Sequence, residues 1–228
     1  MSATLALATL CGSLPSLAET AGAGDASATP EDWAWHGQIT FVEQYHPAFR
    51  SLYRGRDSLD PGSRGDETAD ATLYVGLRLW DGAEAWINGE IDQGFGLSNS
   101  LGVAGFPNGE AYKIGSVSPY PTITRAFLRQ TINLGGDSQP LAADINQLAG
   151  NQTSERIVVT VGKFATADVF DHNLYSDDSK HAFLNWALVD LGTFDYAADA
   201  WGYTYGLAAE WYKDWWVVRG GLFDLSDT

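Results

Sequence analysis

Hydrophobic and polar residues alternate along the stretch from Ala71 to Asp92, in two runs separated by Asp81-Gly82. A period of two is typical of a strand with one buried face. In the first run, the apolar face is Ala71, Leu73, Val75, Leu77 and Leu79, and the opposite face is Thr72, Tyr74, Gly76 and Arg78. In the second run, the two faces are Ala83, Ala85, Ile87, Gly89 and Ile91 against Glu84, Trp86, Asn88, Glu90 and Asp92. Two such runs around a tight turn predict a β-hairpin.

The two faces of this hairpin constrain how its strands pair. A two-residue turn at Asp81-Gly82 would set Leu79 opposite Glu84 and mix the faces. An odd-length loop, such as Trp80-Asp81-Gly82 with glycine in the left-handed conformation, keeps like residues together and sets Arg78 opposite Glu84. The apolar face then either covers a protein core, or it contacts lipid while the polar face lines a pore. Because most amphipathic hairpins belong to soluble sheets, the hairpin alone favours the core.

Three further stretches predict strands by the same alternation. WAWHGQITFVEQYH, from Trp33, sets Trp33, Trp35, Ile39 and Phe41 against His36, Gln38 and Thr40. TITRAFLRQTINL, from Thr122, sets Arg125, Phe127 and Arg129 against Ala126, Leu128 and Ile132. RIVVTVGKF, from Arg156, sets Ile157, Val159 and Val161 against Arg156, Thr160 and Gly162.

Long connections separate these strands, at His46 to Thr68, Gln93 to Pro121, Gly135 to Glu155 and Ala165 to Trp201. In the last of these we expect a short helix near Ala182 to Val189. Longer and shorter connections alternate, as in a barrel with one elaborated rim, although Gly135 to Glu155 breaks the alternation.

The last pair of strands, GYTYGLAAEWYKDWWVVRGGLFDL from Gly202, has aromatic residues at the ends of its apolar face. We expect a two-residue turn at Lys213-Asp214 and an apolar face made of Tyr203, Tyr205, Leu207, Ala209 and Trp211, then Trp216, Val218 and Leu222. Aromatic rings favour the membrane–water interface, whereas in a soluble sandwich they more often lie mid-strand. This pair therefore favours an outer-membrane barrel.

The amino terminus predicts export. Residues 1–18, MSATLALATLCGSLPSLA, are small and apolar up to Ser16-Leu17-Ala18, a sequence suited to signal cleavage, although no Lys or Arg follows Met1. We expect residues 19–31 to be a flexible lead-in and residues 32–228 to belong to the barrel domain. The single cysteine, Cys11, lies in the predicted signal, so the mature chain would have neither a disulfide nor thiolate chemistry.

Composition narrows the function classes. The 228 residues carry a net charge of −16, which argues against nucleic acid and bare anionic lipid as partners, because both would be repelled. Cys and His are not spaced as in a metal site, and we expect no metal and no cofactor. No apolar run after the amino terminus is long enough for a spanning helix, but barrel strands are short and alternate.

Several motifs resemble the carbohydrate-selective porins of the OprB type. They are LRLWDGAEAWINGEIDQGFGLSNSLGVAGFPNGEAYKIG from Leu77, FLRQTINLGG from Phe127, NQLAG from Asn146, VTVGKF from Val159, FLNWALVD from Phe183 and GYTYG from Gly202. The resemblance covers nearly everything from Trp33 onward, and GLSNSLGVAGFPNGEA is its most specific part. It implies an outer-membrane barrel of about sixteen strands with a sugar-selective pore and no enzymatic step.

This chain departs from that family by its strand number, which we count as about seven. An odd number cannot close a barrel, and an open sheet in lipid would leave two edges of unpaired backbone groups. The expected fold class is therefore all-β, an incomplete half of a porin-type transmembrane antiparallel β-barrel. The function implied is passive diffusion of carbohydrates such as glucose through the bacterial outer membrane, with small neutral sugars and outer-membrane lipid as partners. A homo-oligomer is compatible with this.

Parity predicts the candidate pore-lining residues: Arg78, Glu84, Trp86, Asn88, Glu90, Arg125 and Arg129, with Trp186 added from a connection. Sugar hydroxyls both donate and accept hydrogen bonds, which facing arginines and carboxylates match, while the two tryptophans offer faces for sugar C–H groups. A cross-strand ion pair between Arg78 and Glu84 that only stabilises the hairpin fits equally well. For Trp186, packing within its own loop is favoured over contact with sugar.

Two other functions stay open at this point. A secreted, β-rich carbohydrate-binding or carbohydrate-active protein would use Glu84 and Glu90, although these carboxylates lie on one strand rather than across a cleft. A non-functional porin fragment is the other alternative.

Overall fold

The computed structural model describes residues 29–100, 108–113, 115–170, 175, 178–180, 182–189 and 196–225. The predicted export signal, residues 1–18, lies outside the described residues. So do residues 19–28 of the predicted lead-in and residues 101–107 of the most family-like stretch.

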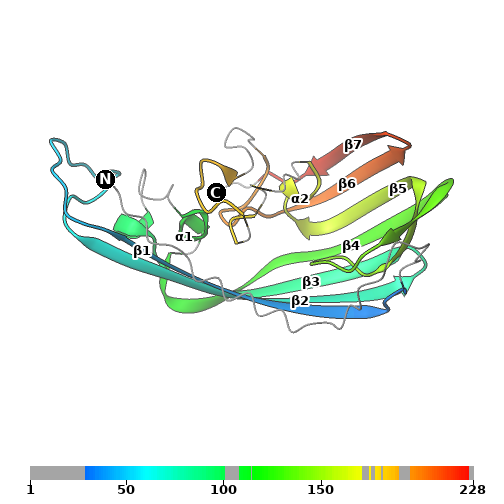
Figure 1. The fold of residues 1–228 in the computed structure, drawn as a ribbon, viewed down its shortest axis with the longest axis horizontal. Coiled ribbons are helices and arrows are strands. Elements are labelled where there is room, and N and C mark those ends of the chain that lie inside the picture. Colours follow the sequence, from blue (N-terminus) through cyan, green and yellow to red (C-terminus); the bar gives the residue numbers. More distant parts are fainter. Residues whose placement is uncertain are drawn as a thin grey trace, which may run out of the picture.

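Seven antiparallel strands form one sheet in chain order within the described part of the chain. They are β1 (Trp33–His46), β2 (Arg64–Trp80), β3 (Ala83–Gly94), β4 (Ser116–Leu141), β5 (Gly150–Phe164), β6 (Thr204–Lys213) and β7 (Trp216–Phe223). Each strand pairs with the next, which leaves β1 and β7 at the two edges. Figure 1 shows the sheet as a curved wall. The predicted fold class, an open part of an all-β barrel, is confirmed.

Among the described residues, three short helices and parts of the longer connections lie on the concave side of this wall (Figure 1). The helices are η1 (Leu97–Ser100), α1 (Gly109–Lys113) and α2 (Ala167–Phe170). Residues 182–189 contain turns rather than the expected helix. Among the described residues, segments of the chain therefore cover the concave side, whereas no other element covers the convex side.

The predicted register of the β2–β3 hairpin is confirmed. Arg78 lies opposite Glu84, and Leu77 lies opposite Ala85. The extra residue is supplied by a β-bulge between Arg78 and Trp80 rather than by a third loop residue. Gly82 has a φ of 71°, the left-handed conformation that glycine adopts without strain. The turn thus keeps the apolar and polar faces separate, as the alternation requires.

The stretch from Gly135 to Glu155 is mostly strand, so its prediction as a loop was wrong. β4 continues to Leu141 and β5 begins at Gly150, with register shifts around Gly135 that let the ladder run past the glycines. Gly135 and Gly136 both have positive φ, which is why the alternation in the sequence breaks there. Only residues 142–149 connect β4 to β5.

The two ends of the wall therefore differ consistently. One end carries the short connections β2–β3, β4–β5 and β6–β7, and the other carries the long connections of residues 47–63, 95–115 and 165–203. The strands extend further into these long connections than predicted, since β2 begins at Arg64 and β4 at Ser116. We call the two ends the short-turn rim and the long-loop rim. The alternation of connection lengths holds throughout.

The β6–β7 turn lies one residue beyond its predicted position. Lys213 pairs with Trp216, so Asp214 and Trp215 form the turn, and Asp214 has a φ of 51°. Aspartate tolerates this conformation better than most residues. Moving a two-residue turn by one position shifts the pairing by two residues, so the faces of both strands stay as predicted.

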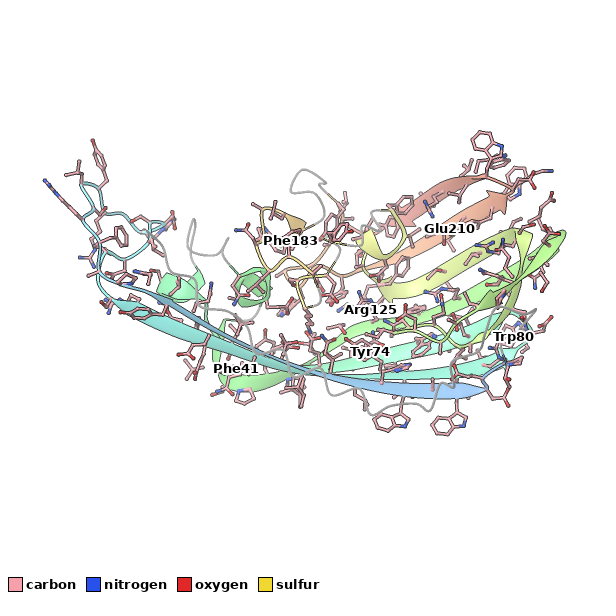
Figure 2. The ribbon with its side chains drawn as sticks, viewed as in Figure 1. Phe41, Tyr74, Trp80, Arg125, Phe183 and Glu210 are labelled. Carbon is pink, nitrogen blue, oxygen red and sulfur yellow. The ribbon has the colours of Figure 1, made fainter. Side chains whose placement is uncertain are left out.

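The convex face of the sheet is apolar and exposed, with aromatic residues toward both ends. Trp33, Trp35, Trp80 and Trp211 are exposed toward the short-turn rim, Phe41, Tyr45 and Tyr205 toward the long-loop rim, and Ile39, Leu73, Ile91, Ile123 and Leu207 between them. Figure 2 shows Phe41 and Trp80 in opposite halves of the sheet, with Trp80 near one end. Aromatic bands flanking an aliphatic band are the pattern of a lipid-facing barrel surface.

Candidate functional site

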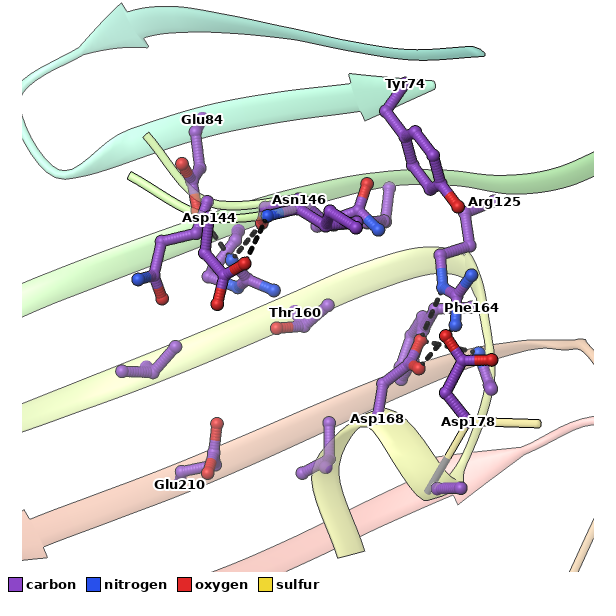
Figure 3. A pocket seen from close by; sticks show the side chains of 18 of the residues that line it. Tyr74, Glu84, Arg125, Asp144, Asn146, Thr160, Phe164, Asp168, Asp178 and Glu210 are labelled. Carbon is purple, nitrogen blue, oxygen red and sulfur yellow. Dashed lines mark hydrogen bonds and ion pairs between the residues drawn. The ribbon is translucent and has the colours of Figure 1, made fainter. Parts of the chain in front are cut away.

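The concave face carries a cavity of about 440 Å³ (Figure 3). Its walls come from β2 to β7, from α2, and from two segments that fold inward, residues 144–147 and 178–180. Of the predicted pore residues, four line it: Glu84, Glu90, Arg125 and Arg129. Its polar groups are arranged mainly as three charged clusters.

The first cluster centres on Arg125 of β4. Its guanidinium donates two hydrogen bonds to Asp168, from Nε at 2.8 Å and from a terminal nitrogen at 2.6 Å. Asp168 is held in turn by the backbone N–H of Ala165, 3.0 Å away, at the start of α2. The guanidinium also lies 5.0 Å from the centre of the Tyr203 ring. A bidentate ion pair with a cation–π contact fixes the arginine in one orientation.

Tyr203 was expected on the lipid face, and this was wrong. It precedes β6, which begins at Thr204, so strand parity does not govern its side chain. Its ring turns toward the concave side, lines the cavity and packs under Arg125. The other tyrosine of that predicted face, Tyr205, is exposed on the convex side.

The second cluster joins Glu84 of β3 to Arg129 of β4. The Arg129 guanidinium lies 2.7 Å from the Glu84 carboxylate and 2.8 Å from the carbonyl oxygen of Asn146. The second Glu84 oxygen accepts a hydrogen bond from the N–H of Leu148 at 3.0 Å. The partner of Glu84 is therefore Arg129, not Arg78 as one interpretation of the sequence had it.

Arg78 instead bonds to backbone. Its Nε donates to the carbonyl of Glu31 and a terminal nitrogen donates to the carbonyl of Ala149, both at 2.8 Å. The residue thus ties the segment before β1 and the β4–β5 connection to the concave face. It does not line the cavity.

The third cluster surrounds Lys180, which enters the concave face from the β5–β6 connection. Its ammonium lies 2.8 Å from Asp70, 2.6 Å from Glu90 and 3.9 Å from Glu110, and its side chain is only 8% exposed. The Thr72 hydroxyl is 3.2 Å away. Three elements, β2, β3 and α1, are thereby tied to one buried cation.

The charge of Lys180 is set by these neighbours. Burial by itself lowers the pKa of the Lys180 ammonium, but the carboxylates of Glu110, Glu90 and Asp70 outweigh it and raise that pKa well above the usual value. Lys180 is therefore positively charged at any physiological pH. Ser179 next to it donates its hydroxyl to Glu110.

The comparison with protein families settles which kind of protein this wall belongs to. The family model of the carbohydrate-selective porins, OprB family, matches residues 56–228. The chain belongs to this family. Comparison with curated proteins and with solved structures gave no match. The match includes β2 to β7 and the connections between them.

Three further predicted pore residues of this porin lie away from the cavity. Trp86 is 3% exposed and its ring lies across Gly76, where a Cβ atom would collide with it. His36 stacks on the Trp86 ring, with the ring centres 6.2 Å apart. Asn88 is fully buried. Trp186 lies against Gly109 of α1 rather than along the cavity.

Sequence reasoning missed several cavity residues of the porin. Parity could have added the cavity residues Tyr74, Glu210 and Tyr212, and also Asp70, which contacts Lys180, because they alternate with lipid-face residues on their strands. Lys180 and Asp168 carry no such signal, since they lie in a connection and a short helix. No helix among the described residues has the length and hydrophobicity needed to cross a membrane.

Proposed function

We propose that this chain forms part of the wall of a passive diffusion channel for small neutral sugars, such as glucose, in the bacterial outer membrane. Sugar passes along the concave face, and the convex face contacts lipid. By the usual orientation of such barrels, the short-turn rim faces the periplasm and the long-loop rim faces outward.

The observation that carries this proposal is the pairing of charges along the cavity. Arg125 with Asp168, Arg129 with Glu84, and Arg219 with Glu210 are ion pairs with contacts of 2.6 to 2.7 Å. Paired charges present hydrogen-bond donors and acceptors side by side and attract no ion strongly. This chemistry suits a neutral polyol better than a charged solute.

The aromatic rings of the cavity support recognition by hydrogen bonds rather than by stacking. Tyr212 has the Arg156 guanidinium 3.8 Å from its ring centre and Arg219 at 5.8 Å, and Tyr203 has Arg125 at 5.0 Å. Cations thus occupy ring faces that a sugar would otherwise use. Of the predicted residues, Arg125 is proposed to contact the passage, together with its partner Asp168.

The proposal is tested by the swelling of liposomes that contain the purified protein. Swelling should be faster in glucose than in a non-sugar solute of equal size. Replacing Arg125→Met should reduce this preference by about fivefold, the value of about one lost hydrogen bond of roughly 1 kcal/mol. Arg56→Met, in an exposed loop pair with Asp57, is the matched control and should change nothing. Equal swelling in both solutes by the unaltered protein would disprove sugar selectivity.

A further inference from the structure

The β4–β5 connection is longer than its strands require. Leu141 and Gly150 are already paired in the ladder, so a two-residue turn would close this hairpin. The chain instead inserts residues 142–149, which we call the inward turn. It is itself ordered, because the backbones of Asp144 and Gln147 exchange two hydrogen bonds of 3.0 Å.

The inward turn folds from the short-turn rim back over the concave face. Asp144, Ile145, Asn146 and Gln147 line the cavity beside Glu84 (Figure 3). Leu148 is 1% exposed and packs in the buried cluster that contains Trp86 and Phe127. The turn therefore fills part of the passage at that end of the sheet.

Charged side chains hold the backbone of this turn at three positions, Asn146, Leu148 and Ala149. Arg129 donates to the carbonyl of Asn146, and the N–H of Leu148 donates to Glu84. At Ala149 the carbonyl accepts from Arg78, and the N–H donates to Glu31 at 2.8 Å. Hydrogen bonds to charged groups are stronger than those between neutral groups, so these contacts are suited to holding a loop against the wall.

We propose that the inward turn is a constriction near the short-turn mouth of the channel, and that Arg78, Glu84 and Arg129 are positioning residues that hold it there. This rests on the proposed channel function. Arg129 then affects sugar passage mainly through the turn that it anchors.

A labelling experiment tests the position of the turn without any transport. In a Cys11→Ser background, Leu148→Cys should react slowly with a maleimide, because the side chain at this position is covered. Adding Glu84→Gln and Arg129→Met should speed the reaction about tenfold or more, as expected when a buried site opens locally. Equal reaction rates in the two backgrounds would overturn the anchoring role.

A transport experiment tests the constriction itself. Replacing residues 142–149 by Asn-Gly should raise the glucose swelling rate about twofold or more, because pore width controls passage. Arg129→Met in the full-length turn should raise the rate in the same direction. Arg54→Met, in an exposed loop, is the control and should leave the rate unchanged.

The double variant separates positioning from direct contact with sugar. If Arg129 acts through the turn, Arg129→Met should have no further effect in the protein that carries the Asn-Gly turn. A further loss of sugar preference there, or an unchanged rate on shortening the turn, would overturn the inference. If the unaltered protein shows no sugar-dependent swelling, the proposed function fails instead, and the labelling result still decides where the turn lies.

Discussion

The two faces of β2 and β3 place adjacent residues in opposite surroundings. On the convex face, Leu73 is 50% exposed, whereas its neighbour Tyr74 on the concave face is 5% exposed. The exposed convex residues of these strands are mainly aliphatic, and the buried concave ones include Asp70, Thr72, Glu84 and Asn88. In a sheet of a soluble protein the apolar side chains are usually buried and the charged ones exposed, which is the reverse of what these strands show. The comparison teaches that the polar side chains of these strands are buried on the concave face, which is the distribution that the proposed channel requires.

The faces should therefore respond differently to substitution. The concave face depends on polar groups that satisfy one another in confinement, so it is sensitive to the loss of one partner. The convex face makes few such contacts and is sensitive to the arrival of a charge in lipid. Four experiments follow, from the largest expected effect to the smallest; the first three test this contrast, and the fourth adds a reference site in a loop.

Lys180→Met should produce the largest loss of stability. It leaves the buried carboxylates of Asp70, Glu90 and Glu110 without their cation, which we expect to cost about 3–5 kcal/mol. Urea titration of the protein in lipid vesicles measures the free energy of unfolding.

The control for that experiment is Lys213→Met. Lys213 lies 3.5 Å from Glu155, and both side chains are at least one-third exposed. Such a pair contributes about 0–1 kcal/mol because water screens it. If the two lysine variants lost the same stability, the contrast between confined and exposed charge would be wrong.

Leu73→Arg tests the convex face. Leu73 lies in the aliphatic band between the aromatic ends, and an arginine near the bilayer midplane should cost about 2–4 kcal/mol. Leu79→Arg, close to the β2–β3 turn, should cost only about 0–1 kcal/mol because the side chain reaches the interface. The same urea titration in vesicles compares them, and equal costs would argue against a lipid-facing surface.

Tyr74→Phe removes a single hydroxyl from the concave face. That hydroxyl donates to the side chain of Gln38 at 2.9 Å, and its loss should cost about 0.5–1.5 kcal/mol. Tyr205→Phe makes the same chemical change on the exposed convex face and should be close to neutral. A larger effect at Tyr205 than at Tyr74 would reverse the assignment of the faces.

We expect the smallest effect on stability at Asp60. This residue lies in the loop of residues 47–63, away from both faces. The Gly62 N–H and the Arg64 guanidinium lower the pKa of its carboxyl from 3.8 to about 2. The ionised carboxylate therefore makes its full contribution to the stability of the loop above about pH 4. This contribution is lost as the pH falls through about 2. As the pH falls over that range, hydrogen exchange of the Gly62 amide should become faster relative to its intrinsic rate at the same pH. In Asp60→Asn the exchange rate should lack this added pH dependence.

The candidate site divides along a similar line between what could and could not be predicted. The alternation along the strands correctly predicted that Glu84, Glu90, Arg125 and Arg129 line the cavity, because alternation is a local property of a strand. It could not give their partners. Glu84 pairs with Arg129 rather than with Arg78, which lies opposite it in the ladder. The register of two strands fixes which Cα atoms lie opposite each other. A long side chain can still reach several neighbours, so the register does not determine its ion-pair partner.

Tryptophans at predicted pore positions illustrate the same limit. Trp86 does face inward as its parity requires, yet its ring is covered by packing that includes Leu148 from a segment predicted to be loop. The alternation around Gly135 and Gly136 gave no sign that the ladder resumes beyond them. A glycine-rich bulge and a true loop have the same composition.

The sequence by itself determined the strands, the separation of lipid-type and polar faces, and the family, because each rests on short-range alternation or on contiguous motifs. Only the tertiary structure decided which connections fold inward, which charges pair, and that Lys180 and Asp168 belong to the concave face. These depend on the curvature of the sheet, which brings residues far apart in the chain into contact. Two opposite charges attract each other more strongly in the protein interior than in water, and only the folded sheet brings these side chains into such an interior.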